Sequence, residues 1–232
     1  MEVWHVDLAS VGEEITELLS DGERGRAAAS LRKPGARLWA RSRGVLRALL
    51  GGHVDLDPRS LHFTEEAGGK PVLEPEGASS AGTGMHLTEP GLSFNMSHSR
   101  GVALYAFSRA GPVGVDVELG GRGQRNREAL AARVFGVGPA ERLKTLDAER
   151  REREFLRMWV RREAALKCMG TGFGARSPAK PEQELWIGEL DVPGGAAALA
   201  LRGAPQELRC RSWTGGTTSR VCKQGARVAT GS

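Results

Sequence analysis

Trp159-Val160-Arg161-Arg162-Glu163-Ala164-Ala165-Leu166-Lys167 contains strong helix formers and neither glycine nor proline, which predicts a helix. Trp159, Glu163 and Lys167 follow one another at four-residue intervals, so they share one face of that helix. A face that carries an aromatic ring, a carboxylate and an ammonium in a row is neither a clean apolar stripe nor a clean solvent face. It suits a site where the carboxylate meets a cation and the ammonium meets an anion.

A second acidic element lies upstream, at Gly114-Val115-Asp116-Val117-Glu118. Its alternation predicts a strand in which Asp116 and Glu118 point to the same side. Two carboxylates this close repel each other unless a cation lies between them. With Glu163 they would form an oxygen site for a hard cation such as Mg²⁺, and Lys167 would meet a phosphate beside it. The alternative is a pair of exposed carboxylates on an edge strand, with Lys167 paired to Glu163 on the helix surface.

The composition limits the class of protein. The 232 residues are 40% hydrophobic, which is enough for the core of one large domain or of two domains of about 100–120 residues. A net charge of +5 favours anionic partners, either nucleic acid or a polyphosphorylated cofactor together with an acidic protein. Cys168, Cys210 and Cys222 include no Cys-x-x-Cys pair, which argues against a disulfide framework or a zinc site. We find no basic leader and no apolar run of about 18–20 residues, so we expect a cytoplasmic protein without a membrane span.

Hydrophobic periodicity and turn residues predict an α+β chain. Strands are expected at residues 3–8, 61–64, 92–96, 102–108, 113–118, 185–190, 197–201, 208–213 and 219–223. Helices are expected at residues 13–19, 24–31, 36–50, 127–135, 139–146 and 151–169, with Gly51-Gly52 ending the third. Residues 74–88 are expected to form a flexible loop. This order predicts two similar halves joined near Gly111, residues 1–111 and 112–232.

Two further elements belong to the same pattern: Gly69-Lys70-Pro71 and Phe94-Asn95-Met96-Ser97-His98-Ser99. In this order, and with Trp159 some forty residues after Asp116, the elements resemble the phosphopantetheinyl transferase family, specifically its surfactin-synthetase-activating (Sfp-type) branch. One departure is Arg162, where the family usually has lysine. Arginine keeps the charge but is a planar fork rather than a point charge. We expect Arg161 and Arg162 at the surface, Trp159 in the core and Cys168 as a structural thiol.

The resemblance implies two pseudo-symmetric α/β halves in one chain, with the active site in the cleft between them. The first half would contact the nucleotide of coenzyme A, and the second would supply the carboxylates and the helix. The implied Mg²⁺ ligands are Asp116, Glu118 and Glu163, with Glu163 alternatively the base, and the implied catalytic residues are Glu163, Lys167 and His98. The implied cofactor contacts are Lys167 and His98 on the phosphates, Ser97 near the adenine end, Lys70 and Pro71 flanking the adenine, and Arg37 on the 3′-phosphate, with Arg24, Arg26 and Arg32 as weaker matches.

The implied reaction transfers the 4′-phosphopantetheine arm of coenzyme A to a serine of an apo acyl or peptidyl carrier protein, as in polyketide or nonribosomal peptide biosynthesis. It depends on Mg²⁺ and releases 3′,5′-ADP. Because one chain holds both halves, we expect a monomer rather than the trimer of the shorter holo-acyl-carrier-protein synthases, and no nucleic-acid or membrane partner. Two other classes fit parts of the sequence. A Mg²⁺-dependent nuclease or phosphatase would use the carboxylates and the lysine, and a non-catalytic basic protein would bind DNA through its arginines.

Overall fold

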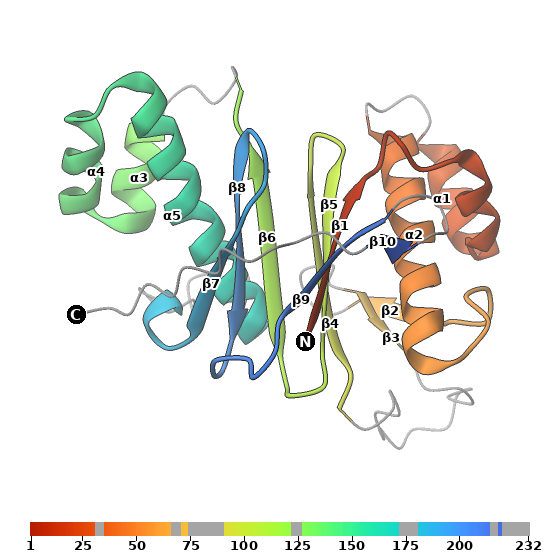
Figure 1. Ribbon diagram of the computed structural model, residues 1–232. Coiled ribbons are helices and arrows are strands. Elements are labelled where there is room, and N and C mark those ends of the chain that lie inside the picture. The colour runs from red at the N-terminus through yellow and green to blue at the C-terminus, as the bar shows by residue number, and fades with distance from the viewer. Residues whose placement is uncertain are drawn as a thin grey trace. The chain divides into compact units, whose positions relative to one another are not determined.

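The computed structural model describes residues 1–30, 35–65, 71–73, 91–121, 127–171, 181–213 and 218–219 (Figure 1). Helices and strands are mixed along the chain, so the predicted α+β class is confirmed. The chain divides into two compact units. Of the described residues, the first unit contains 1–94, 101–111, 208–213 and 218–219, and the second contains 95–100 and 112–207.

The two units are not two continuous halves of the chain. One boundary falls at residues 111 and 112, near the expected place, but two segments change sides. Residues 95–100 belong to the second unit, where their side chains bind the strand at 113–119. Residues 208–213 belong to the first unit because this late strand pairs in parallel with the N-terminal strand. Both segments therefore lie outside the unit to which a division at residue 111 would assign them.

A five-stranded sheet of order β10-β9-β1-β5-β4 belongs to the first unit except for residues 95–99 of β4, which are counted in the second. The N-terminal strand β1 pairs antiparallel with β5 and parallel with β9, so it lies inside the sheet. β5 is buried from Ala103 to Ser108, as a largely apolar central strand requires. The bounds of these strands are β1 Glu2–Asp7, β4 Ser93–Ser99, β5 Val102–Ser108, β9 Arg209–Trp213 and β10 Thr218–Ser219.

Two helices, a 3₁₀ turn and a short hairpin complete the first unit. They are η1 (Glu13–Leu18), α1 (Asp21–Ala29), α2 (Ala36–Val54), β2 (Phe63–Glu65) and β3 (Pro71–Leu73). α2 continues through Gly51-Gly52, which corrects the expected end of this helix, and it stops where Asp55 adopts a left-handed conformation. A Cβ on Gly51 would lie 2.8 Å from the carbonyl oxygen of Leu56. This glycine therefore allows a close approach of the following loop instead of ending the helix.

The second unit contains a three-stranded antiparallel sheet of order β6-β8-β7. Its strands are β6 (Val113–Leu119), β7 (Trp186–Leu190) and β8 (Gly195–Leu201), and its helices are α3 (Arg127–Phe135), α4 (Val137–Lys144), α5 (Ala148–Met169) and the 3₁₀ turn η2 (Pro181–Gln183). Asp147 caps the N-terminus of α5 and its side chain accepts the Arg150 N–H, while Gly170 in the left-handed region caps the C-terminus. α5 lies along the sheet, with α3 and α4 beyond it (Figure 1).

Small residues let α5 approach the sheet closely. Ala164 and Ala165 of the helix belong to one buried cluster with Ala196, Ala198 and Ala200 of β8. A Cβ on Gly114 of β6 would lie only 2.0 Å from the carbonyl oxygen of Ala164. The helix backbone thus rests directly on the strand backbone at residue 114.

The remaining predictions for the fold have mixed outcomes. Trp159 is partly buried against the core of the second unit and stacks on Phe155 at 5.9 Å, as expected. The flexible loop predicted at 74–88 lies outside the described residues, as does most of the strand predicted at 219–223. None of the described helices is long and apolar enough to cross a membrane.

Candidate functional site

The carboxylates of β6 lie on the face that α5 covers. Gly114, Asp116 and Glu118 alternate with Val115 and Val117 along β6, so they share one face. Gly114 contacts the α5 backbone, so Asp116 and Glu118 lie on the same face of β6 as that contact. Asp116 is only 4% exposed and Glu118 is half-buried. The strand and the helix therefore meet along a polar row.

Lys167 connects α5 to this row. Its Nζ donates to Asp116 Oδ1 at 2.6 Å and to the carbonyl oxygen of Val115 at 3.1 Å. The Lys167 side chain retains 27% of its exposure while the Asp116 side chain retains 6%. The ammonium thus compensates a buried carboxylate and keeps one side open to solvent, where an anionic group has access to it.

Glu163 shares the electrostatic environment of the β6 carboxylates. Burial and, after it, the charge of Asp116 raise the pKa of Glu163 to about 7, against the opposing charges of Lys167 and Arg162. Burial also raises the pKa of Glu118, and Asp116 adds to that shift while a hydrogen bond from Ser99 opposes it. Three carboxylates thus repel one another in a site that is partly removed from water.

Two oxygen atoms in this site lack partners. Asp116 Oδ2 and Glu163 Oε1 are both buried, and neither has a hydrogen-bond partner among the described residues. A buried carboxylate oxygen without a donor is costly, and a cation is the partner that two such oxygens accept together. In the part of the chain that the structure describes, no group of three Asp, Glu, His or Cys side chains is arranged to hold a metal ion by itself. Mg²⁺ fits this partial set, because it commonly takes one or two carboxylates and completes its shell with water and substrate phosphates.

A row of side chains from β4 borders the same carboxylates. Ser97 Oγ donates to Asp116 Oδ1 at 2.8 Å, and Ser99 Oγ donates to Glu118 Oε2 at 2.9 Å. Asn95 Oδ1 accepts the Val115 N–H at 3.0 Å. Neither Asn95 nor Ser99 was predicted to lie at the carboxylates. Their spacing of two residues, matched to the two-residue spacing of the acids, was the pattern that could have predicted it.

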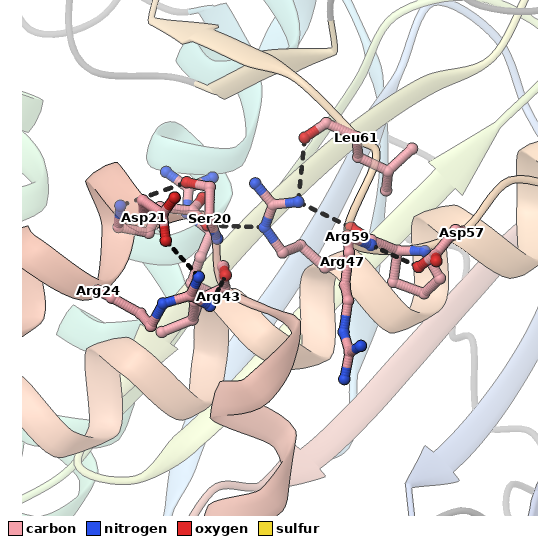
Figure 2. Close-up of polar contacts among 11 residues, drawn as sticks. Ser20, Asp21, Arg24, Arg43, Arg47, Asp57, Arg59 and Leu61 are labelled. Atoms are coloured by element: carbon pink, nitrogen blue, oxygen red, sulfur yellow. Dashed lines mark hydrogen bonds and ion pairs between the residues drawn. The ribbon is translucent and has the colours of Figure 1, made fainter.

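An arginine-rich pocket lies in the first unit. Its volume is about 360 Å³, and it is lined by Ser20, Gly22, Glu23, Arg26, Arg43, Arg47, Arg59, Leu61, His62 and Phe63. Figure 2 shows Arg47 reaching the carbonyl oxygen of Leu61. This hydrogen bond measures 3.0 Å, and Arg47 Nε donates to Glu23 at 2.6 Å. Arg43 also pairs with Glu23, at 3.2 Å. The lining has more arginines than acids, so the pocket carries excess positive charge.

Comparison with known proteins identifies the family. A family model described as the 4′-phosphopantetheinyl transferase superfamily matches residues 112–219. The 4′-phosphopantetheinyl transferase HetI of Nostoc sp. is 33% identical over 175 residues, which cover 74% of this chain and 69% of HetI. This chain belongs to the 4′-phosphopantetheinyl transferase family. The 4′-phosphopantetheinyl transferase psf-1 of Bacillus pumilus is 29% identical over 173 residues, covering 72% of this chain and 67% of psf-1.

Family membership confirms the resemblance drawn from the sequence motifs and disfavours the nuclease and DNA-binding alternatives. The matched segment contains Asp116, Glu118, Glu163 and Lys167. Assignment to the surfactin-synthetase-activating branch stays a prediction.

The predicted residues of the second unit meet different outcomes. Asp116, Glu118, Glu163 and Lys167 come together, although their roles in binding and catalysis stay predictions. Arg162 is buried, which corrects its expected surface position, because it lies on the part of α5 that faces away from solvent. Phe94 to Ser99 lie within β4, so this strand continues beyond its expected end at residue 96. His98 is exposed and alternates with the buried Ser97 and Ser99, so it points away from the carboxylates.

The predicted nucleotide contacts of the first unit are dispersed. Arg37 is exposed in the first turn of α2 and does not line the arginine-rich pocket, whereas Arg26 does. Arg24 binds the Leu19 carbonyl oxygen and the Asp21 carboxylate. Pro71 begins β3. Lys70 and Arg32 lie outside the described residues.

Proposed function

We propose that this protein transfers the 4′-phosphopantetheine arm of coenzyme A to a serine of an apo acyl or peptidyl carrier protein. The observation that carries the proposal is the meeting of Asp116, Glu163 and Lys167 in a chain of the phosphopantetheinyl transferase family. The carrier serine Oγ attacks the phosphorus that bears the pantetheine arm. The bond from this phosphorus to the bridging oxygen breaks, and 3′,5′-ADP leaves.

The partial carboxylate set would hold Mg²⁺ through Asp116 Oδ2 and Glu163 Oε1, with Glu118 as the third carboxylate. When bound, Mg²⁺ would offset the negative charge of the pyrophosphate as the bond breaks. Lys167 offers an ammonium beside the same site, which can contact phosphate oxygens and orient them. Alternatively, the carboxylate of Glu163 can act as the base that accepts the serine proton. A metal-binding measurement separates the roles, because Glu163→Gln weakens metal affinity only if Glu163 is a ligand.

The arginine-rich pocket is the region that we assign to the 3′-phosphate of coenzyme A. Arg26 replaces Arg37 as our preferred contact, because it lines this pocket and lies over the Trp39 ring at 5.4 Å. Arg43 and Arg47 are held there by Glu23, which leaves the cavity positive overall. Dephospho-coenzyme A lacks this phosphate and is therefore the probe. We expect Arg26→Ala to raise KM about 10–100-fold for coenzyme A and to leave KM for dephospho-coenzyme A unchanged. Arg37→Ala serves as the matched control.

The experiment that tests the reaction is intact-mass spectrometry of an apo carrier protein. The carrier is incubated with this protein, coenzyme A and Mg²⁺. We expect one phosphopantetheine arm on the carrier serine, loss of the product when EDTA is present, and formation of 3′,5′-ADP in equal amount. Failure to modify any of several acyl and peptidyl carriers would refute the proposal. Light scattering of the same preparation tests the proposal that the protein acts as a monomer.

A further inference from the structure

Side chains of β4 replace a neighbouring strand along one edge of β6. β6 is the edge strand of its three-stranded sheet, because only β8 pairs with it there. Its N–H groups at residues 115, 117 and 119 donate to Asn95 Oδ1 at 3.0 Å, Ser97 Oγ at 3.3 Å and Ser99 Oγ at 3.1 Å. We call these three acceptors the 95/97/99 ladder. They fix the register of β6 against β4 by side-chain hydrogen bonds.

The two serines of the ladder do more than accept these N–H groups. Each serine hydroxyl also donates its only proton to a carboxylate, Ser97 to Asp116 and Ser99 to Glu118. The same arrangement therefore occurs twice: one hydroxyl binds a carboxylate and the N–H of the next residue. One position earlier on this face stands Gly114, which has no carboxylate, and there the ladder uses an amide oxygen instead. Hydroxyls occur where acids occur.

The hydroxyl of Ser97 also determines which oxygen of Asp116 stays available. Asp116 Oδ1 accepts both Ser97 Oγ and Lys167 Nζ, whereas Oδ2 is buried without a hydrogen-bond partner among the described residues. Rotation of this carboxylate would break both bonds to Oδ1. Since the proton of Ser97 is committed to Asp116, the side chain of Ser97 cannot donate to a coenzyme A phosphate at the same time.

We propose that Ser97 and Ser99 are positioning residues, which orient Asp116 and Glu118 so that their other oxygens face the metal ion. This inference rests on the proposed function, because it assumes that the carboxylates bind Mg²⁺. Loss of such an outer-shell partner typically weakens metal affinity by about 10–100-fold. We therefore expect Ser97→Ala and Ser99→Ala to raise the Mg²⁺ concentration for half-maximal transfer by about that factor, with kcat recovering at saturating Mg²⁺.

Ser108→Ala is the matched control. Ser108 is also a buried serine in a strand, and its hydroxyl accepts one backbone N–H, that of Ala110. It belongs to the first unit, and its hydroxyl binds no carboxylate among the described residues. Ser97→Thr and Ser99→Thr keep the hydroxyl and should restore the wild-type value. A purely structural role would lower the melting temperature of the alanine variants without changing the metal dependence.

The deciding measurement is Mn²⁺ binding followed by electron paramagnetic resonance in the presence of coenzyme A and without a carrier protein. We expect weaker binding in Ser97→Ala and Ser99→Ala, and unchanged binding in Ser108→Ala and the threonine variants. Unchanged affinity in both alanine variants would overturn the inference and leave the proposed function intact. Absence of Mn²⁺ binding in the wild type would overturn the metal site and the inference together. If Ser97→Ala does not fold, Ser99→Ala and the two threonine variants decide the result.

Discussion

Replacing Gly114 by alanine should damage the site without touching any of its charged groups. The new Cβ would lie 2.0 Å from the Ala164 carbonyl oxygen and 2.5 Å from the Cys168 N. Ordinary contact begins at 3.4 Å, so α5 and β6 must separate by about 1.4 Å, the difference between 3.4 and 2.0. Both obstructing atoms belong to the backbone, so no side-chain rotation can relieve the clash. Overpacking of this kind costs about 1–3 kcal/mol of unfolding free energy.

The same displacement carries Lys167 and Glu163 away from Asp116. The Lys167–Asp116 hydrogen bond of 2.6 Å would lengthen beyond hydrogen-bonding distance if α5 moved as a rigid helix. Misplacement of catalytic groups by about 1 Å can cost roughly 100-fold in rate. We expect Gly114→Ala to lower the urea midpoint and to reduce carrier modification by about that factor in the intact-mass assay.

Gly138→Ala in α4 is the matched control, because its Cβ would meet only Arg142 Nη1, at 4.0 Å. It should fold and act like the wild type. If Gly114→Ala kept both the stability and the transfer rate of the wild type, the direct backbone contact between α5 and β6 could not be what positions the site.

Three other predictions follow from the described contacts. Lys167→Met should abolish transfer and, because it leaves Asp116 with less compensation in a buried position, lower the unfolding free energy by about 1–3 kcal/mol in urea titrations. Arg47→Met should lower the free energy of unfolding by about 3–5 kcal/mol, because the buried Arg47 donates to Glu23, Pro58 and Leu61. A decrease below about 1 kcal/mol in the same urea titrations would contradict this reasoning. Burial lowers the pKa of His5 and of His53 below 6.5, so the unfolded chain takes up protons before the folded protein does. The free energy of unfolding should therefore fall as the pH drops from about 6.5 through the folded pKa values. His53→Gln should flatten that dependence in melting curves recorded between pH 5 and 8.

Local patterns in the sequence were sufficient to predict the helix and the strand that bear the carboxylates. The long helix and the strand at 113–119 follow from residue spacing, and so does the common face of Glu163 and Lys167. What the sequence alone could not supply are partners far apart along the chain. The parallel pairing of β1 with β9 joins residues about two hundred positions apart, and no periodicity encodes it. For the same reason, the ion pairs of Glu23 with Arg43 and Arg47 could not be predicted from the sequence.

Arg162 shows why charge is a poor guide to exposure at such a site. A run of charged residues on a helix normally predicts a solvated face, and its neighbour Arg161 does pair with Glu189 in a partly exposed position. Arg162 is buried instead, where its charge opposes the rise in the pKa of Glu163. The charge of Arg162 therefore acts on the neighbouring Glu163, an interaction that the pattern of charged residues along the helix does not predict.

The segment Gly114 to Glu118 acts as one physical unit instead of a set of separate ligands. Val115 and Val117 are fully buried on one face of β6, which fixes the strand in the core. On the other face Gly114 admits the α5 backbone, and that close approach brings Lys167 within 2.6 Å of Asp116. Keeping both acids but enlarging residue 114 would therefore preserve every charge and still lose the geometry. A chain with these carboxylates and a bulky residue in place of the glycine should fold poorly or lack the site.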